Sequence, residues 1–364
     1  MGCIVKEIKG ILHFLVQAKI EPGNINVVQL SPTLQATRSN YTLQHKGRAP
    51  KYLKYFNGAK SVTVLLDQLQ TEQGSRFFRK RNRNIIVEID KDIEVESEFI
   101  WLTLGQIKKL ALVDNFINMD LRTVISSIPL QHEKDQTQAT NFLGELVKAP
   151  SNSEDTMCCD GEIMSWIVNL RAMSDRTTVI CSIDELKGWS INRDGIFHSE
   201  NRHFDVIWAN ITISNREVAS WDQPIVRPRD HGLIGFFVKK VHDQWYFLVQ
   251  AKMECGSFEP VELTSSLCFV PSSYSNPERE IPFYSYFLQA SKIDFIVDTM
   301  QSEEGGRFFH EQNRNFIVNV DDSFTYSSTE FPDYRWMTYV QLLNLMAHSN
   351  YVSIQARSLL SLIG

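Results

Sequence analysis

The sequence predicts an α+β protein made of two copies of one domain-sized unit. The hexapeptide FLVQAK occurs at residues 14–19 and again at 247–252, and such self-similarity indicates a duplicated structural unit. Apolar and polar residues then alternate, as they do in a strand with one buried face. We therefore assign residues 1–128 to a first repeat, 129–160 to a polar linker and 161–364 to a second repeat.

The repeat extends well beyond the hexapeptide. TEQGSRFF at residues 71–78 matches SEEGGRFF at 302–309, and NRN follows in both copies, at 82–84 and 313–315. These matches span a whole unit, which indicates a tandem duplication rather than a solenoid of short repeats.

Hydrophobic periodicity predicts the first elements of the first repeat. Strands are expected at 14–19 and 28–37, because polar and apolar residues alternate there. The Pro-Gly-Asn sequence at 22–24 predicts the turn between them. The apolar residues of 62–69 recur at helical spacing and predict a helix of about four turns.

The remaining elements follow by the same criteria. The apolar run at 84–89 predicts a buried strand. Helices are expected at 103–113 and from Asn118, whose side chain can cap the second of them. The second repeat is expected to begin with a helix at 163–170 and strands at 204–214, 216–221 and 233–239.

The two repeats differ in the length of chain that precedes FLVQAK. The first repeat has only 13 residues there, whereas the second has roughly 80 residues of expected helix and strands. Missing strands leave unpaired edges and an open apolar face. We therefore expect a first repeat that is incomplete at its N-terminus, and a chain that associates or has low solubility.

Composition and charge exclude several classes of protein. The 364 residues are enough for two full cores. A net charge of -6 implies no general affinity for nucleic acid, and no apolar run approaches the ~18 residues of a membrane span. The six cysteines form no CxxC pair and have no zinc-ligand spacing, so we expect reduced thiols in the cytoplasm.

The expected strand at 28–37 carries a row of polar side chains on one face. An outer face in contact with water is the ordinary interpretation, but such a face usually carries charged residues. This row has only uncharged donors and acceptors, which suits a cleft for a neutral polar ligand such as a sugar or a base. The row consists of Gln29, Ser31, Thr33, Gln35 and Thr37, and Gln17, Lys19 and Glu21 share one face of the preceding strand.

Five segments resemble the NDP-hexose 2,3-dehydratases, and together the matches cover nearly the whole chain. The run QLSPTLQATRSNY is the most specific of them. The segments are FLVQAKIEPGN (14–24), VQLSPTLQATRSNYT (28–42), TEQGSRFFRKRNRN (71–84), NREVASWDQP (215–224) and HGLIGFF (231–237).

The resemblance implies both an activity and an architecture. These enzymes are carbon–oxygen lyases that remove water across C2–C3 of a dTDP-4-keto-6-deoxyhexose, giving a 3,4-diketo-2,6-dideoxyhexose in deoxysugar and antibiotic biosynthesis. The implied fold is a tandem repeat of a unit similar to the Nudix hydrolases, assembled as a homodimer. The Nudix box itself is absent from the sequence, so neither a metal nor another cofactor is implied.

Two departures from the family pattern affect the expected site. The family normally carries a further N-terminal segment, which makes the activity of this chain uncertain. The turn EPGN of the first repeat becomes ECGS at 254–257 in the second, and the polar row becomes partly apolar there, ending at Val270. We therefore expect the first repeat to hold the better-preserved site.

The family reaction needs a base at C3, a donor at the C4 oxygen and an acid near the C2 oxygen. We assign Glu21 as the base, Lys19 as the group that stabilises the enolate and Tyr41 as the acid. A surface glutamate, a strand-face lysine and a packed tyrosine are the alternatives. The expected substrate-binding residues are Gln17, Asn24, Gln29, Ser31, Thr33, Gln35, Thr37, Arg38, Ser39, Asn40 and Arg76.

Two other functions compete with the dehydratase. A catalytically inactive homologue that still binds nucleotide sugar would bind thymidine diphosphate without turnover. A scaffold that uses the repeat for pseudo-symmetric dimerisation would not bind the nucleotide at all.

Overall fold

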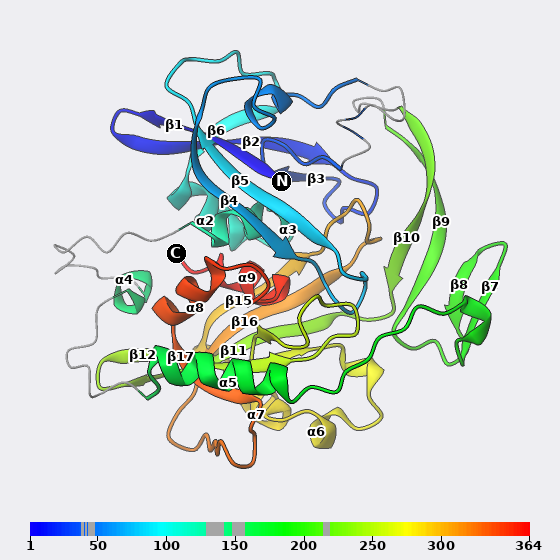
Figure 1. Ribbon diagram of the computed structural model, residues 1–364, viewed down its shortest axis with the longest axis vertical. Coiled ribbons are helices and arrows are strands. Elements are labelled where there is room, and N and C mark those ends of the chain that lie inside the picture. Colours follow the sequence, from blue (N-terminus) through cyan, green and yellow to red (C-terminus); the bar gives the residue numbers. More distant parts are fainter. Residues whose placement is uncertain (38–39, 41, 43–47, 129–141, 148–156, 214–218) are drawn as a thin grey trace.

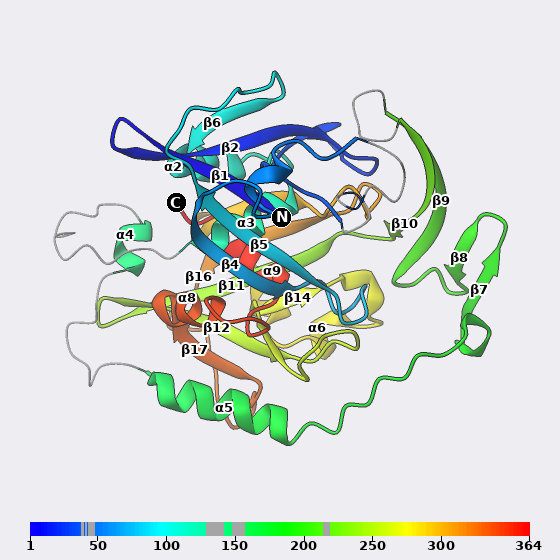
Figure 2. The ribbon, with the colours of Figure 1, turned by 45° about the horizontal axis from the view of Figure 1, so that its top comes forward.

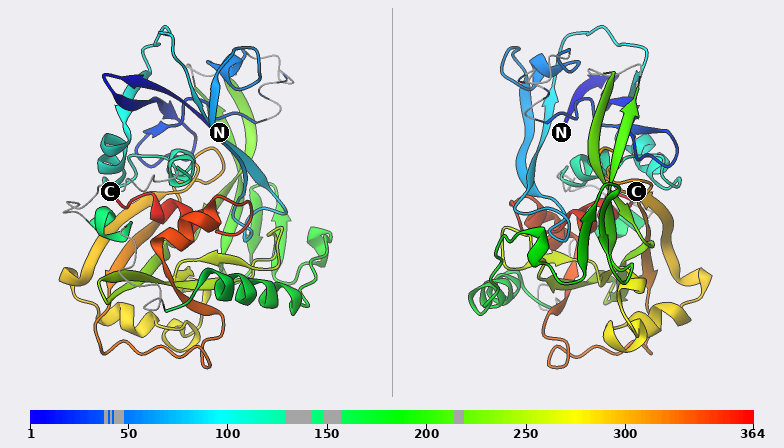
Figure 3. Two further views of the ribbon diagram at one scale, coloured as in Figure 1. Left: turned by 60° about the vertical axis from the view of Figure 1, so that its left-hand side comes forward. Right: turned by 90° about the vertical axis from the view of Figure 1, so that its right-hand side faces the viewer.

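Two mixed β-sheets share one hydrophobic core, and helices α3 (Met119–Ser126) and α9 (Ile354–Leu360) pack on each other between them (Figure 1). Buried residues from both sheets and both helices belong to one continuous apolar cluster. Figure 3 shows the same layers from two further sides. The computed structural model describes residues 1–37, 40, 42, 48–128, 142–147, 157–213 and 219–364.

The first sheet has the order β3-β2-β1-β5-β4, and β6 pairs with β2. β1 and β5 are parallel and the other neighbours are antiparallel. Helix α2 (Leu104–Ala111) follows β6, and α3 follows α2. The strands are β1 (Gly2–Ile8), β2 (Ile11–Ile20), β3 (Val28–Ser31), β4 (Thr63–Thr71), β5 (Arg81–Glu88) and β6 (Phe99–Thr103).

The second sheet has the matching order β13-β12-β11-β16-β15, with β17 paired to β12 and β14 to β11. Here too the central pair, β11 and β16, is parallel. Helices α6 (Pro277–Glu280), α7 (Tyr284–Gln289) and α8 (Tyr339–Met346) complete this half. The strands are β11 (Gly232–Val241), β12 (Gln244–Lys252), β13 (Glu262–Thr264), β14 (Leu267–Phe269), β15 (Phe295–Ser302), β16 (Gln312–Asn319) and β17 (Tyr334–Thr338).

A third sheet, of order β10-β9-β8-β7, curves along one side of the molecule (Figure 2). Helices α4 (Phe142–Leu146) and α5 (Asp160–Ala172) precede it in the chain. In the described part of the chain, no helix is long and apolar enough to cross a membrane. The strands are β7 (Trp189–Asn192), β8 (Gly195–His198), β9 (Phe204–Thr212) and β10 (Ser220–Pro228).

Most of the strongly patterned elements are confirmed. Both FLVQAK segments are strands, β2 and β12, and they occupy corresponding positions in the two sheets. The buried strand at 84–89 is β5, and α2 lies within the expected 103–113. The cap of α3 is also confirmed, because Asn118 Oδ1 accepts a hydrogen bond from Leu121 N at 2.9 Å.

The helix predicted at 62–69 is wrong, because this segment belongs to strand β4. The prediction assumed that all its apolar side chains are buried on one helical face. Leu65 and Leu69 are instead 44% and 45% exposed, whereas Leu66 is buried and Val62 is partly buried. The inward positions further along are polar: Gln70 is buried and donates to Met346 O at 2.9 Å.

Two other expectations about the first repeat need correction. The strand predicted at 28–37 ends at Ser31, because Pro32 has no N–H for the sheet ladder. Residues 2–8, which we expected to leave the unit open, form β1 between β2 and β5. The first sheet therefore has the strand that corresponds to β11, while the longer segment before β11 forms α5 and the separate third sheet.

Candidate functional site

Two glycine-containing turns each dock on a loop from the other half of the chain. The turn 21–24 contacts the loop 303–310: Gly23 N donates to Gly305 O at 2.7 Å, and His310 N donates to Gly23 O at 2.9 Å. A Cβ at Gly23 would lie 1.7 Å from Phe308 O. Only glycine permits this approach, so the EPGN turn is fixed against the loop between β15 and β16.

The second pair has the same geometry with the two halves exchanged. Gly256 N donates to Gly74 O at 2.8 Å, and Arg79 N donates to Gly256 O at 2.7 Å. A Cβ at Gly256 would lie 2.1 Å from Phe77 O. The turn 254–257 is thus fixed against the loop 72–79, and each turn-and-loop pair combines residues from both halves of the chain.

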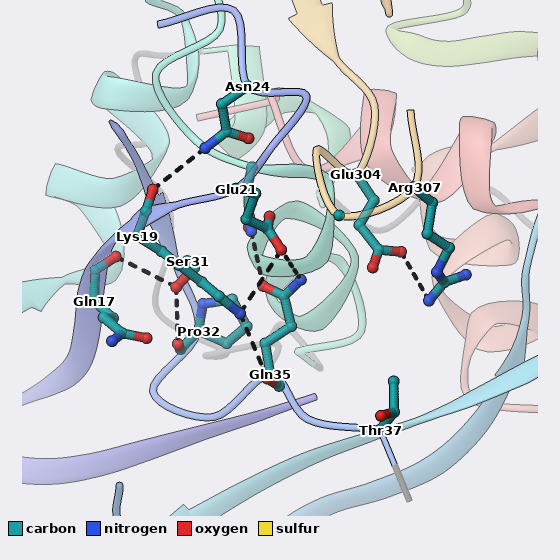
Figure 4. Close-up of polar contacts among 12 residues, drawn as sticks. Gln17, Lys19, Glu21, Asn24, Ser31, Pro32, Gln35, Thr37, Glu304 and Arg307 are labelled. Carbon is teal, nitrogen blue, oxygen red and sulfur yellow. Dashed lines mark hydrogen bonds and ion pairs between the residues drawn. The ribbon is translucent and has the colours of Figure 1, made fainter. Parts of the chain in front are cut away.

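Glu21 lies at the centre of the first pair (Figure 4) and is 5% exposed. Gln35 Nε2 donates to Glu21 Oε1 at 2.9 Å, and Lys19 Nζ lies 3.8 Å from the same oxygen. Asn118 Nδ2 in turn donates to Gln35 Oε1 at 3.0 Å. The residue that caps α3 therefore orients Gln35, and Gln35 orients the Glu21 carboxylate.

The loop 303–310 brings a second carboxylate to the same place. A Cβ built on Gly306 would lie 3.1 Å from Glu21 Oε1 and 3.4 Å from Glu304 Oε1. The other oxygen of Glu304, Oε2, is 2.8 Å from Arg307 Nη2, and Figure 4 shows this ion pair beside Glu21. The two carboxylates therefore both approach Gly306.

Glu72 and Asp120 extend this group of acidic residues. Oxygen atoms of Glu72, Asp120 and Glu304 lie within 4.8 Å of one another. Burial, with the nearby charges of Glu72 and Glu21, raises the pKa of Asp120 to about 7. Burial and the proximity of Asp120 also raise the pKa of Glu304 well above its usual value, although Arg307 opposes the shift.

The spacing of these three carboxylates also suits a divalent cation, but positive groups already lie among them. Arg307 Nη1 is 3.9 Å from Glu72 Oε2, and Lys80 interacts electrostatically with both Glu72 and Glu304. A divalent ion would be repelled by both cations. The cluster is therefore better described as an ion-pair network whose carboxyls share protons than as a metal centre.

Residues of strand β10 form hydrogen bonds with the backbone of the loop 303–310. Val226 N donates to Arg307 O at 2.9 Å, and Phe309 N donates to Val226 O at 2.7 Å. Gln223 Nε2 donates to Gly306 O at 2.8 Å, while Trp221 Nε1 donates to Gln223 Oε1 at 2.7 Å. The SWDQP sequence and Val226 thereby fix the backbone of the loop that carries Gly306 and Arg307.

The middle of the predicted polar row is buried and bonded within the protein. Gln29 donates to Asn115 O and to Ser302 Oγ, both at 2.8 Å. Ser31 Oγ donates to Gln17 O at 3.3 Å, and Thr33 Oγ1 accepts from Ile4 N at 2.9 Å. These side chains lie neither on an outer face nor in an open cleft, because each is at most 2% exposed.

The other predicted residues fall into three groups. Asn24 Nδ2 donates to Val27 O at 3.1 Å and stabilises the turn 21–24, whereas Thr37 is exposed and bonds Asn40. Arg76 lies in the loop 72–79, over the ring of Phe204, and so belongs to the second pair. Arg38, Ser39 and Tyr41 lie outside the described residues.

Sequence reasoning missed four charged residues at the first pair. The matching motifs TEQGSRFF and SEEGGRFF contain three of them, but the repeat alone does not say which half of the chain each loop contacts. Asp120 lies in the first turn of α3, and no sequence motif marks it. The missed residues are Glu72, Asp120, Glu304 and Arg307.

The buried, oriented carboxylates and the adjacent lysine define a site suited to acid–base chemistry on a polar ligand. The comparison with protein families agrees with this class. The family model for NDP-hexose 2,3-dehydratase matches residues 1–128 and 160–363, and the chain belongs to that family.

Similar proteins match along the whole chain. A dTDP-4-dehydro-6-deoxy-alpha-D-glucopyranose 2,3-dehydratase of Saccharopolyspora spinosa is 39% identical over 99% of this chain and 75% of its own length. Proteins with the same description from Amycolatopsis orientalis and Streptomyces violaceoruber are 38% and 36% identical over 100% of this chain. They are matched over 73% and 80% of their own lengths.

Proposed function

We propose that this chain is a hydro-lyase that removes water across C2–C3 of a dTDP-4-keto-6-deoxyhexose to give a 3,4-diketo-2,6-dideoxyhexose. Its family and the descriptions of its relatives support the reaction and the substrate. The observation that carries the proposal is the buried Glu21 carboxylate, held by Gln35 at 2.9 Å with Lys19 Nζ at 3.8 Å. The inactive homologue would need no such arrangement.

The chemistry divides between these groups. Glu21 removes the C3 proton, which is acidic because the C4 ketone holds the resulting charge as an enolate. Lys19 stabilises that charge from within the same buried cluster, where electrostatic interactions are stronger than in water. The C2 hydroxyl then leaves as water, and the enol product rearranges to the diketo sugar.

The binding residues remain a proposal. Gln17, Asn24, Thr37 and Asn40 would contact the sugar and nucleotide around the turn 21–24. The roles of Arg38 and Ser39 in binding and of Tyr41 as an acid stay predictions from the sequence. Gln29, Ser31 and Thr33 would support the site from within the fold, since their polar groups bond protein atoms.

The finer architecture is proposed from the two matching sheets. Residues 1–128 and 161–364 would be tandem copies of one Nudix-like unit, and the same strand order in both sheets supports this. We further propose a homodimer that works in the cytoplasm in deoxysugar biosynthesis, a compartment that suits six free thiols.

Turnover of the 4-keto sugar nucleotide tests the function directly. The expected result is the loss of one water from the sugar nucleotide, followed by mass spectrometry, together with binding of thymidine diphosphate by titration calorimetry. Binding without dehydration would favour the inactive homologue. Failure of the folded protein to bind the nucleotide would favour the scaffold.

A Gln35→Ala variant is expected to lower kcat about 10-fold with a smaller change in KM. Gln35, predicted from the sequence to bind substrate, donates to Glu21 Oε1, so its loss leaves Glu21 without this orienting donor. Cys268→Ala is the matched control at the corresponding position of the second sheet, where Lys252 Nζ donates to Cys268 O at 2.6 Å. Equal losses in steady-state kinetics of the two variants would contradict the assignment of the site to the first pair.

A Gly306→Ala variant is expected to lower kcat/KM by about 100-fold or more. Its methyl group would lie 3.1 Å from Glu21 Oε1 and 3.4 Å from Glu304 Oε1, so it would crowd both of the carboxylates proposed to act on the sugar. Ser75 occupies the matching position of the other loop, so Ser75→Ala is the control and should change kcat/KM less than about twofold. Unchanged kinetics of Gly306→Ala would mean that the sugar binds elsewhere.

A further inference from the structure

Glu304 faces Glu21 from a loop that belongs to the other half of the chain. One point, the Cβ position above Gly306, is 3.1 Å from Glu21 Oε1 and 3.4 Å from Glu304 Oε1. The two carboxyl oxygens, Glu21 Oε1 and Glu304 Oε1, therefore both lie beside Gly306, on opposite sides of the contact between the two halves. Two oxygens so placed can act on adjacent carbons of one sugar ring.

The contacts of Glu304 fix which oxygen faces the ligand. Oε2 is held by Arg307 Nη2 at 2.8 Å, and Oε1 is the oxygen that approaches the Cβ position of Gly306. The loop itself is anchored on both sides. Gln223 binds the carbonyl of Gly306, and Gly23 N binds the carbonyl of Gly305 at 2.7 Å. Glu304 is thus positioned by the β10 strand and by the turn that carries Glu21.

We propose that Glu304 is the catalytic acid that protonates the departing C2 hydroxyl, opposite Glu21 as the base. This assignment rests on the proposed dehydratase function. It gives the reaction an acid that lies beside the proposed base.

The surroundings of Glu304 favour its protonated form. Its pKa lies well above the usual value because the carboxyl is buried and close to Asp120, with Glu72 and Glu21 adding negative charge. Arg307 is the opposing positive neighbour. Like charges crowded in a buried space favour the protonated forms of their carboxyl groups.

Every proton that Glu21 and Glu304 exchange with the sugar is returned within one turnover. Glu21 takes the C3 proton, the C3–H electron pair becomes the C2=C3 bond, and the C2–O electron pair leaves with the oxygen. Glu304 gives its proton to that oxygen, which departs as water. In the rearrangement C2 gains the proton held by Glu21 and the C3 hydroxyl returns one to Glu304. Both groups then regain their starting states without any other reactant.

The test changes the leaving group, because fluoride departs without needing a proton. Glu304→Gln is expected to dehydrate the natural 4-keto sugar nucleotide at least about 100-fold more slowly than wild type. With the C2-fluoro analogue, the ratio of wild-type to Glu304→Gln turnover should be at least about 10-fold smaller than with the natural substrate. The corresponding ratio for Glu21→Gln should not become smaller. Glu303→Gln is the matched control, because Glu303 bonds Asn313 at 2.6 Å and also bonds Gln73.

Each other outcome has a definite meaning. The acid assignment is overturned if Glu304→Gln turns over the natural substrate as fast as wild type. It is also overturned if the variant still binds thymidine diphosphate but its turnover of the natural substrate and of the C2-fluoro analogue falls by the same factor. If wild type itself releases no water from the natural substrate, the proposed function fails, whatever the variants do. Nucleotide binding and circular dichroism of each variant show that it is folded.

Discussion

A Glu21→Gln variant is expected to lose dehydratase turnover by about 10³-fold. The amide keeps the shape of the side chain but cannot accept the C3 proton, and it cannot match the donors Lys19 and Gln35 that now face one carboxylate oxygen. Binding of thymidine diphosphate should change little, because Glu21 acts on the sugar. Steady-state kinetics and titration calorimetry on the same preparation measure both.

Glu254→Gln is the matched control for this prediction. Glu254 occupies the corresponding turn, where Lys252 Nζ lies 3.6 Å from its Oε1 and Ser75 N donates to its Oε2 at 3.1 Å. The position that corresponds to Gln35 is Cys268, so no side-chain amide orients the carboxylate there. A loss in Glu254→Gln as large as in Glu21→Gln would show that the second pair carries the chemistry.

The sequence predicts the parts of this site that depend on local pattern. FLVQAK is a strand because its alternation suits a half-buried sheet, and Asn118 caps α3 because its side chain accepts from Leu121 N. The turn 21–24 is fixed by its Pro-Gly-Asn sequence. Each of these features requires only a few neighbouring residues, so the pattern is enough to specify it.

Features that depend on contacts between the two halves could not be predicted in this way. The apolar residues Leu65 and Leu69 predict a helix at 62–69, but both are exposed on strand β4. Gln29 seemed available to a ligand, but the other half of the chain supplies its partner Ser302. Glu304 reaches Glu21 only because the turn-and-loop pairs cross between the halves.

The polar bonds that join the halves predict a large loss of stability on changing Arg122. This side chain is 1% exposed, and Arg122 Nε donates to Ser358 Oγ at 2.8 Å while Nη2 donates to Ser302 O at 2.6 Å. Burial lowers the pKa of Arg122 only to about 10, so the guanidinium is charged at neutral pH. Both of these partners come from the second half of the chain.

Arg122→Met should therefore destabilise the fold by about 3–5 kcal/mol. Methionine fills much of the volume but donates no hydrogen bond, which leaves the carbonyls of Ile117 and Ser302 buried without this donor. Urea unfolding should show a lower midpoint with an unchanged slope. Arg83→Met is the control, since the half-exposed Arg83–Asp67 ion pair is expected to contribute less than about 1 kcal/mol.

Arg357 makes the corresponding contact in the opposite direction, with its Nη2 donating to Thr71 O at 2.8 Å. Because each buried arginine ties one half to the other, the two sheets should unfold in a single transition, and Arg122→Met should lower the whole of it. Two separated transitions in Arg122→Met, with the second sheet unaffected, would contradict this coupling. The same result would mean that the Glu21–Glu304 pair is held by its glycine turns alone, and that the site depends less on the shared core than these contacts indicate.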